Sequence, residues 1–329
     1  MKLSKPKLLV ARAMFLDELA CLNDYFELEL NQEDHIFSPE ELEQRLQGKL
    51  GMICTSSAKI NQALLMKLPE LKIISTIAVG YDNFDLQACT QYRVMATNAP
   101  DVLNETTADF AWALMMATAR RVSEAEHFLR AGEWKKWGVD FFVGADIHGA
   151  CLGILGMGRI GQAIARRAAG FGMKVIYHNR SRLSADQELA AHHARYVDKE
   201  TLLRESDHLI LALPYSSHSH HSITAAELAL MKSSATLINI ARGGIVNDLD
   251  LIQALQAKRI AGAGLDVFEN EPRFHPDFLA LKNVVLTPHI ASASERTRRA
   301  MVRRAIANVI AVARGETPPD LLNRDVLEM

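Results

Sequence analysis

Residues 152–161, with the sequence LGILGMGRIG, constrain the fold of this chain more than any other segment. They place a GxGxxG pattern directly after a short apolar run and directly before an amphipathic helix. Gly156 then permits a tight turn, Gly158 lets a pyrophosphate approach the backbone, and Gly161 lets the helix pack close to the strand. The anion would lie on unpaired N–H groups at the positive end of the helix dipole. The cofactor-binding residues expected in this turn are Gly156, Met157, Gly158, Arg159, Ile160 and Gly161.

Composition bounds the class of protein. The chain has 329 residues, enough for about two domains, and 49% hydrophobic with 23% charged residues is ordinary for a globular protein. With a formal net charge of −2, the chain has no excess of basic residues of the kind that nucleic-acid-binding proteins show. No apolar run has the length of a membrane span. We therefore expect neither nucleic acid nor membrane as a partner. Four scattered cysteines without a CxxC pair, and an N-terminal apolar run broken by charged residues, favour the cytoplasm.

Strand-like and helix-like segments alternate along most of the chain, which predicts parallel α/β layers. The first hundred residues have expected strands at 8–11, 51–55 and 73–77 and expected helices at 39–47 and 61–67. One long helix is expected at 105–131 and another at 295–314. A second series of strands predicts a doubly wound parallel sheet and lies at 151–155, 174–178, 208–213, 236–240, 262–267 and 284–287.

The position of the glycine motif predicts how the chain divides. The motif lies in mid-chain, with α/β units before it and a final helix after the second series of strands. A domain inserted within another accounts for this order. We expect residues 1–100 plus 292–329 to form the substrate domain and residues 101–291 to form the cofactor domain.

Three polar side chains follow strands of the second series. Arg242 and a Gly pair end one strand, Glu271 lies beyond the next, and His289 ends a third. Parallel α/β sheets bind ligands at the carboxyl ends of their strands. Singly, such an Arg could cap a sheet edge and such a His could be structural. Together, downstream of a nucleotide motif, they suit carbonyl reduction, which needs a hydride donor, a cation for the keto acid and an acid for the alkoxide.

The end of the second strand indicates which cofactor binds. NAD-binding domains place an Asp or Glu there for the ribose 2′-hydroxyl, whereas this strand ends in Asn179, Arg180, Ser181 and Arg182. Arg180 can pair with a 2′-phosphate and Ser181 can donate to it. Arg182 is either a second cation or a solvated loop residue. We therefore expect NADPH to be favoured over NADH, and no metal, because residues 218–221 (HSHH) lack a carboxylate or Cys partner.

The sequence resembles the D-isomer-specific 2-hydroxyacid dehydrogenase family over essentially its whole length. GMGRIG, NIARGGIV, GLDVFENEP and TPHIAS occur in order and at the spacing of that family. STIAVGYDNFD, ETTAD and AGEW bring it closest to the glyoxylate/hydroxypyruvate reductases and 2-ketogluconate reductases. The resemblance implies a flavodoxin-like first domain and a Rossmann-type cofactor domain. It also implies a homodimer formed through the long helix and the loop that follows it.

The resemblance further implies roles for individual residues. Arg242 would bind and polarise the 2-oxo acid, His289 would donate the proton, and Glu271 would hold His289 protonated. Backbone N–H groups of Val79 and Gly80 would bind the substrate carboxylate. Asp266 would fix the nicotinamide amide. The other residues expected to contact the cofactor are Thr107, Leu213, Pro214 and Ala241.

The implied function is reduction of glyoxylate and hydroxypyruvate, with 2-keto-D-gluconate as a further candidate. Phosphoglycerate dehydrogenase is an alternative, although no regulatory domain follows the last helix. A nucleotide-sensing corepressor built on the same scaffold is an alternative from another class, but its peptide-docking features and disordered tails are not evident. Trp134 and Trp137 could be core residues or could lie at a dimer contact that reaches the neighbouring active site.

Overall fold

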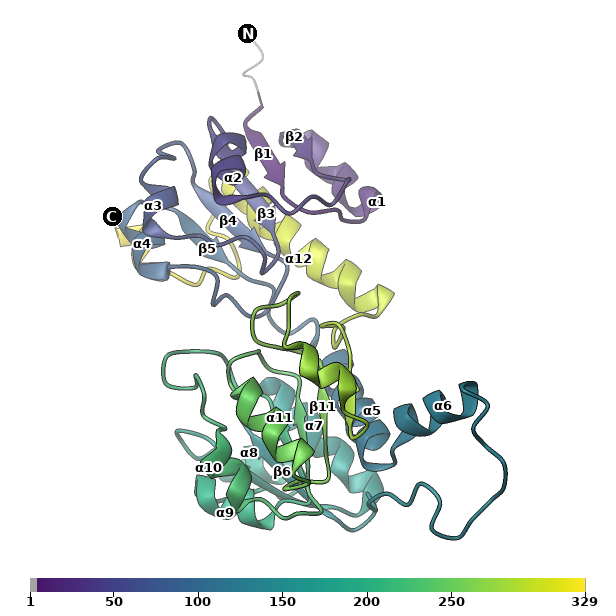
Figure 1. Cartoon of the computed structure of the whole chain (residues 1–329). Helices are drawn as coiled ribbons and strands as arrows, with labels where there is room; N and C mark the ends of the chain where they lie inside the picture. Colours follow the sequence, from purple (N-terminus) through teal and green to yellow (C-terminus); the bar gives the residue numbers. More distant parts are fainter. Residues whose placement is uncertain (1–4, 329) are drawn as a thin grey trace. The chain divides into compact units, whose positions relative to one another are not determined.

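The computed structural model describes residues 5–328, which form two compact units, each built on a parallel β-sheet (Figure 1). One unit holds the chain up to Leu103 and again from Ser294, and the other is Asn104–Ala293. The chain therefore leaves the first unit after Leu103 and re-enters it at Ser294. In the described part of the chain, no helix is both long and apolar enough to span a membrane.

The first unit is a five-stranded sheet with the strand order β2-β1-β3-β4-β5, which is the flavodoxin-like order. Its strands are β1 (Lys7–Val10), β2 (Glu27–Leu30), β3 (Gly51–Cys54), β4 (Ile73–Thr76) and β5 (Met95–Thr97). Its helices are α1 (Leu16–Leu19), η1 (Ala20–Asp24), α2 (Pro39–Leu46), α3 (Gln62–Leu65), α4 (Leu86–Gln91), α12 (Glu295–Ala313) and η4 (Arg324–Glu328).

Local sequence explains these elements. The strands β3 and β4 are buried along their whole length, as expected for central parallel strands covered on both faces. Helix α2 begins with Pro39 after Ser38, whose hydroxyl accepts the N–H of Glu41 while the Glu41 side chain returns to the Ser38 backbone. Leu42 and Leu46 then bury the helix against the sheet.

The second unit is a seven-stranded parallel sheet with the order β12-β11-β10-β9-β6-β7-β8. Counted from β6, this is the Rossmann order 3-2-1-4-5-6 with one further strand. The strands are β6 (Cys151–Leu155), β7 (Lys174–His178), β8 (Arg195–Tyr196), β9 (His208–Leu211), β10 (Thr236–Asn239), β11 (Gly262–Leu265) and β12 (Val284–Leu286). The helices are α5 (Asn104–Ala119), α6 (Val122–Arg130), α7 (Arg159–Arg167), η2 (Ala168–Phe171), α8 (Ala185–Ala190), α9 (Lys199–Glu205), α10 (Ala225–Leu230), α11 (Asp248–Gln256) and η3 (Pro276–Ala280).

Alternate residues of each central strand enter two different cores. Leu209 and Leu211 pack with residues of α9, α10 and α11, whereas Ile210 between them packs with residues of α5 and α7. Helices therefore cover both faces of the sheet, and only the edges where strands begin and end remain for a ligand.

The helix expected over residues 105–131 is two helices. Arg121 adopts a left-handed backbone (φ 54°) between α5 and α6, so the hydrogen-bond ladder stops there. The carbonyl of Ala119, freed at the end of α5, accepts the N–H of Ala145 at 2.9 Å. A long-range contact that periodicity does not encode thus ends the helix. In Figure 1, α6 and the loop after it extend away from the sheet of their unit.

Three short strands were not expected from the sequence. The strand β2 is an edge strand of alternating Glu and Leu that is only partly buried, and β5 and β8 have three and two residues. Such segments carry too little hydrophobic pattern to stand out, and pairing with a longer neighbour stabilises them.

Candidate active site

The glycine turn joins β6 to α7 in the geometry that the motif requires. Gly156 has φ 100°, and a Cβ there would lie 2.6 Å from the backbone N of Leu213. A Cβ at Gly161 would lie 2.4 Å from the carbonyl oxygen of Gly156, so α7 can approach β6 only with glycine. A Cβ at Gly158, the N-cap of α7, would meet nothing within 4 Å. Open space at a helix N-terminus fits a bound pyrophosphate.

The two arginines that follow β7, Arg180 and Arg182, have different surroundings. Asn179 Oδ1 accepts the N–H of Met157 at 2.6 Å and so ties this strand end to the glycine turn. Arg182 binds the carboxylate of Glu188 through two hydrogen bonds of 2.8 Å. Arg180 and Ser181 are exposed, and within residues 5–328 neither makes a hydrogen bond or an ion pair. Arg182 is therefore a structural residue of this turn, and Arg180 is the cation left for a ligand.

The other residues expected at the cofactor lie in the same unit. Leu213 and Pro214 follow β9, and Ala241 follows β10, so all three lie at the carboxyl edge of the sheet with the glycine turn. Thr107 lies in the first part of α5 and is 5% exposed.

Arg242 lies in a loop whose backbone is held on both sides. The side chain of Asn239, the last residue of β10, accepts the N–H of Ala241 and donates to the carbonyl of Arg242, both at 3.1 Å. A Cβ at Gly243 would lie 1.7 Å from the carbonyl oxygen of Phe268, so this loop packs directly on the loop after β11. Sequence reasoning missed Asn239, although a buried polar residue at the end of an apolar strand needs hydrogen-bond partners.

Asp266 connects β11 to the loop that carries His289. Its carboxylate is fully buried and accepts Thr287 Oγ1 at 2.7 Å and the N–H groups of Ile290 and Ala291 at 2.8 Å. Burial raises the pKa of Asp266, and these hydrogen bonds oppose the rise because they favour the charged form. Three of about four acceptor positions are thus used inside the protein. This structural role was not expected from the sequence.

Glu271 and His289 form a hydrogen-bonded pair at this edge. Oε2 of Glu271 lies 2.8 Å from Nδ1 of His289, while Oε1 accepts the N–H of Phe268 at 2.8 Å. His289 has a left-handed backbone (φ 55°), an uncommon conformation that costs on the order of 1 kcal/mol in a non-glycine residue. Its N–H donates to the carbonyl of Asp266 at 2.9 Å, which helps to hold it there. Among residues 5–328, Nε2 of His289 has no hydrogen-bond partner, and the side chain is 42% exposed.

Sheet register brings these residues to neighbouring strand ends. Asn239, Leu265 and Leu286 are aligned on β10, β11 and β12, which are adjacent. Arg242, Glu271 and His289 each follow one of these strands. The carboxyl edge that carries the glycine turn therefore also carries a guanidinium and a His–carboxylate pair, which is the set that carbonyl reduction requires.

In the first unit, Val79 and Gly80 follow the carboxyl end of β4. Asn98 Nδ2 donates to the carbonyl of Val79 at 2.8 Å, which fixes the loop. Across the described residues, the N–H groups of Val79 and Gly80 have no hydrogen-bond acceptor. Two adjacent unpaired N–H groups suit an anion.

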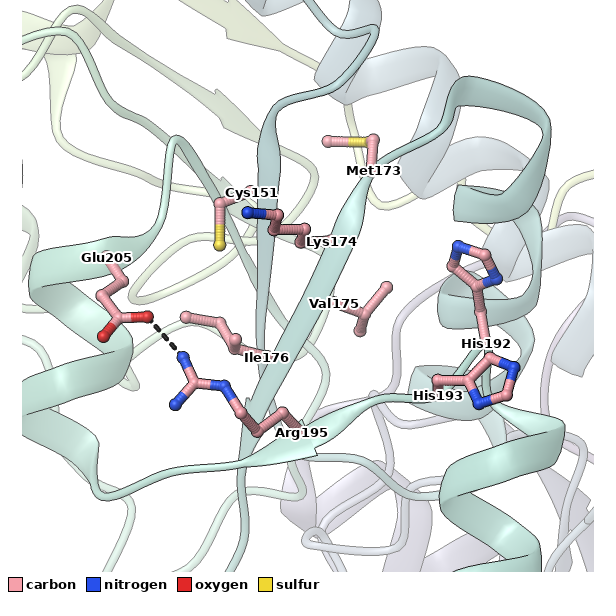
Figure 2. A pocket seen from close by; sticks show the side chains of 9 residues that line it. All are labelled: Cys151, Met173, Lys174, Val175, Ile176, His192, His193, Arg195 and Glu205. Carbon is pink, nitrogen blue, oxygen red and sulfur yellow. Dashed lines mark hydrogen bonds and ion pairs between the residues drawn. The ribbon is translucent and has the colours of Figure 1, made fainter.

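A separate open groove of about 490 Å³ lies at the opposite edge of the seven-stranded sheet (Figure 2). Cys151 and Lys174 line it, and they are the first residues of β6 and β7. Arg195 in this groove is paired with Glu205 at 2.5 Å (Figure 2). The groove therefore does not include the strand ends that carry the candidate active site.

Comparison with known proteins identifies the family. The profile "D-isomer specific 2-hydroxyacid dehydrogenase, NAD binding domain" matches residues 112–291. The chain belongs to the D-isomer specific 2-hydroxyacid dehydrogenase family. Among curated members, the glyoxylate reductase of Thermococcus onnurineus is 44% identical over 99% of this chain and 98% of its own length. That of Pyrococcus furiosus is 43% identical over 99% of this chain and 97% of its own length.

Solved structures of this family share the fold. The NADPH-dependent glyoxylate/hydroxypyruvate reductase of Sinorhizobium meliloti, in complex with NADP and malonate, has a TM-score of 0.86 at 32% identity over 97% of this chain and 98% of that chain. The glyoxylate reductase of Paecilomyes thermophila has a TM-score of 0.87 at 30% identity over 98% and 99% of the two chains. Two parallel-sheet domains, one inserted in the other, were therefore correctly predicted from the sequence.

Proposed function

We propose that this dehydrogenase reduces small 2-oxo acids, chiefly glyoxylate and hydroxypyruvate, to D-2-hydroxy acids with NADPH, and that 2-keto-D-gluconate is a further substrate. The His289–Glu271 pair carries the proposal, because it presents a ring nitrogen that has no hydrogen-bond partner among residues 5–328, at the sheet edge that also carries Arg242 and the glycine turn. Relatives named glyoxylate reductase and glyoxylate/hydroxypyruvate reductase support the substrate class.

The chemistry assigned to the protein is proton transfer and charge stabilisation. NADPH, when bound, supplies the hydride that reduces the carbonyl carbon. Nε2–H of His289 donates the proton that the carbonyl oxygen acquires, so the product is a hydroxyl group and neutral His289 remains. Glu271, fixed by Phe268 N–H, favours the protonated ring before transfer. Arg242 stabilises negative charge on the carbonyl oxygen and holds the keto acid by its planar fork.

The substrate carboxylate needs its own donors. We assign this role to the N–H groups of Val79 and Gly80, which are not paired within residues 5–328. The glycine turn, Thr107, Leu213, Pro214 and Ala241 are assigned to the cofactor. The acceptor position left on Asp266 is assigned to the nicotinamide amide, and Arg180 with Ser181 and Asn179 to the adenosine ribose and its 2′-phosphate.

Steady-state turnover tests this function directly. NADPH oxidation is measured with glyoxylate, hydroxypyruvate, 2-keto-D-gluconate and pyruvate, and kcat/KM is compared across the four acids. Glyoxylate or hydroxypyruvate should give the highest value. Failure to turn over any 2-oxo acid with either nicotinamide cofactor would contradict the proposal.

We further propose a cytoplasmic homodimer that forms through α6 and the loop after it. Trp134, Trp137 and Val139 are 55%, 73% and 85% exposed, so the two tryptophans are not core residues. In the same segment, Phe128, Phe141 and Phe142 pack ring against ring. Exposed apolar side chains grouped in this way are typical of protein interfaces. In sedimentation experiments, Trp137→Lys with Val139→Asp should convert a dimer to monomer, and a monomeric wild type would contradict the assignment.

The four cysteines are free thiols, which suits the cytoplasm.

A further inference from the structure

A second histidine–carboxylate pair lies at the carboxyl edge of the seven-stranded sheet. His221, in the loop after β9, has its Nε2 hydrogen-bonded to Oε1 of Glu269. Glu269 belongs to the loop after β11 and precedes Glu271 by two residues. The two side chains are 32% and 27% exposed, so the pair is partly shielded from water. No role in the reaction proposed above uses it.

The backbone of His221 joins a third loop to this pair. Its N–H donates to the carbonyl of Gly244 at 2.7 Å, two residues beyond Arg242. Its Nδ1 lies 3.5 Å from Nδ2 of Asn247, the residue that caps α11. His221 therefore contacts both the loop that carries Arg242 and the loop that carries Glu271.

Those two loops are already in direct contact. The close approach of Gly243 to the carbonyl of Phe268 leaves no room for a side chain between them. The N–H of Phe268 in turn fixes Glu271, which pairs with His289. Because Phe268, Glu269 and Glu271 lie within one short turn, a displacement of Glu269 would also move the N–H of Phe268 and with it the carboxylate of Glu271.

Other titratable groups surround the pair. Asp248, the first residue of α11, accepts the N–H of Glu269 at 3.1 Å and is 6% exposed. Burial, with the nearby charge of Glu269, raises the pKa of Asp248 to about 6, whereas His275 and His221 act in the opposite direction. The ring of His220 stacks on His221 at 3.8 Å and bonds to the hydroxyl of Tyr215 at 3.1 Å. The Nε2–H of His221 therefore gives the Glu269 carboxylate a hydrogen-bond donor next to the carboxyl group of Asp248.

We propose that His221 is a positioning residue for the reaction, which holds the Arg242 loop and the Glu271 loop in one arrangement through Gly244 and Glu269. The inference rests on the proposed function, because its effect is exerted through Glu271 on His289. Within residues 5–328, no hydrogen bond joins His221 to either member of that pair, and its role is to keep Glu271 directed at Nδ1 of His289.

The test is the alkaline limb of the pH profile of keto-acid reduction, the range in which the rate falls as the pH rises. His221→Phe keeps a ring to stack on His220 but removes the donor to Glu269. We expect kcat/KM to fall about tenfold, since a misplacement of about 1 Å can cost up to about 10²-fold. The limb should also move to lower pH, in the same direction as in Glu271→Gln. In the Glu271→Gln background, His221→Phe should move it no further.

Two further variants control for damage to the fold. His221→Gln, whose amide can reach the position of Nε2, should restore the limb, and Glu269→Ala should shift it even if His221→Phe does not fold. His218→Gln, on an exposed residue of the same loop, should leave the profile unchanged. If His221→Phe lowers the rate equally at every pH while Glu271→Gln moves the limb, this inference alone is wrong. If Glu271→Gln leaves the limb unmoved, the proposed function of the His289–Glu271 pair fails with it.

Discussion

The carbonyl of Asp266 accepts the N–H of His289 at 2.9 Å, and its carboxylate accepts the next two N–H groups, those of Ile290 and Ala291. One buried residue directly after β11 thus fixes the backbone that carries the candidate proton donor. With Glu271 holding Nδ1, both the backbone and the ring of His289 are set before a substrate binds. Such preorganisation is what an effective general acid requires.

His289→Ala should therefore abolish most of the activity. Removing a positioned general acid typically lowers kcat by about 10²- to 10⁴-fold. The binding of NADPH, followed by quenching of protein fluorescence, should change little because the glycine turn is intact. Near-normal reduction of glyoxylate by this variant would show that another group donates the proton.

The variant Arg242→Lys tests whether the planar guanidinium of Arg242, and not only its positive charge, is needed to bind the keto acid. Lys keeps the positive charge but lacks the planar fork that binds a carboxylate through two hydrogen bonds. KM for the keto acid should rise steeply and kcat should fall, while the Kd of NADPH stays nearly constant. Loss of NADPH binding with unchanged keto-acid kinetics would instead place Arg242 at the cofactor.

The Glu188 carboxylate predicts an acid-sensitive element beside the end of β7. Hydrogen bonds from Arg182 and from the Tyr177 hydroxyl lower the pKa of Glu188 from 4.5 to about 2. Because the folded value is the lower one, the stabilisation is complete above about pH 4.5 and is lost as the pH falls towards 2. Glu188→Gln should lower Tm at neutral pH, and the difference from wild type should shrink between pH 5 and 2.

Thermal unfolding followed by circular dichroism measures this difference. Glu200→Gln is the matched control, because Glu200 forms an exposed pair with Arg204 within one helix and such pairs contribute little. A Tm difference for Glu188→Gln that stays constant down to pH 2.5 would rule out the assigned ionisation.

The positions of the candidate catalytic residues at strand ends could be predicted from the sequence, because a parallel sheet places the carboxyl ends of its strands at one edge. Arg242, Glu271 and His289 each follow an apolar run, and adjacent parallel strands bring such positions to one edge. The contacts between loops could not be predicted in this way. Asn239, the anchoring by Asp266 and the His221–Glu269 pair depend on how turns of different lengths meet in space. The same holds for the break at Arg121, which is coupled to the return of the chain at Ala145.

The different surroundings of Arg180 and Arg182 predict which cofactor the enzyme prefers. Glu188 already binds Arg182, whereas Arg180 is exposed and has no ion pair within residues 5–328. Residues 179–182 at the end of β7 include no Asp or Glu to accept the ribose 2′-hydroxyl of NADH, and Oδ1 of Asn179, the acceptor atom of that side chain, already accepts the N–H of Met157. We expect NADPH to be preferred by at least about tenfold in kcat/KM, or roughly 1.4 kcal/mol.

Arg180→Asp should erase or invert this ratio, mainly through the KM of the cofactor. Arg182→Ala should instead lower Tm and leave the ratio nearly unchanged, since its partner is inside the protein. Equal use of NADH and NADPH by the wild-type enzyme, or a ratio that responds to Arg182→Ala and not to Arg180→Asp, would overturn this assignment.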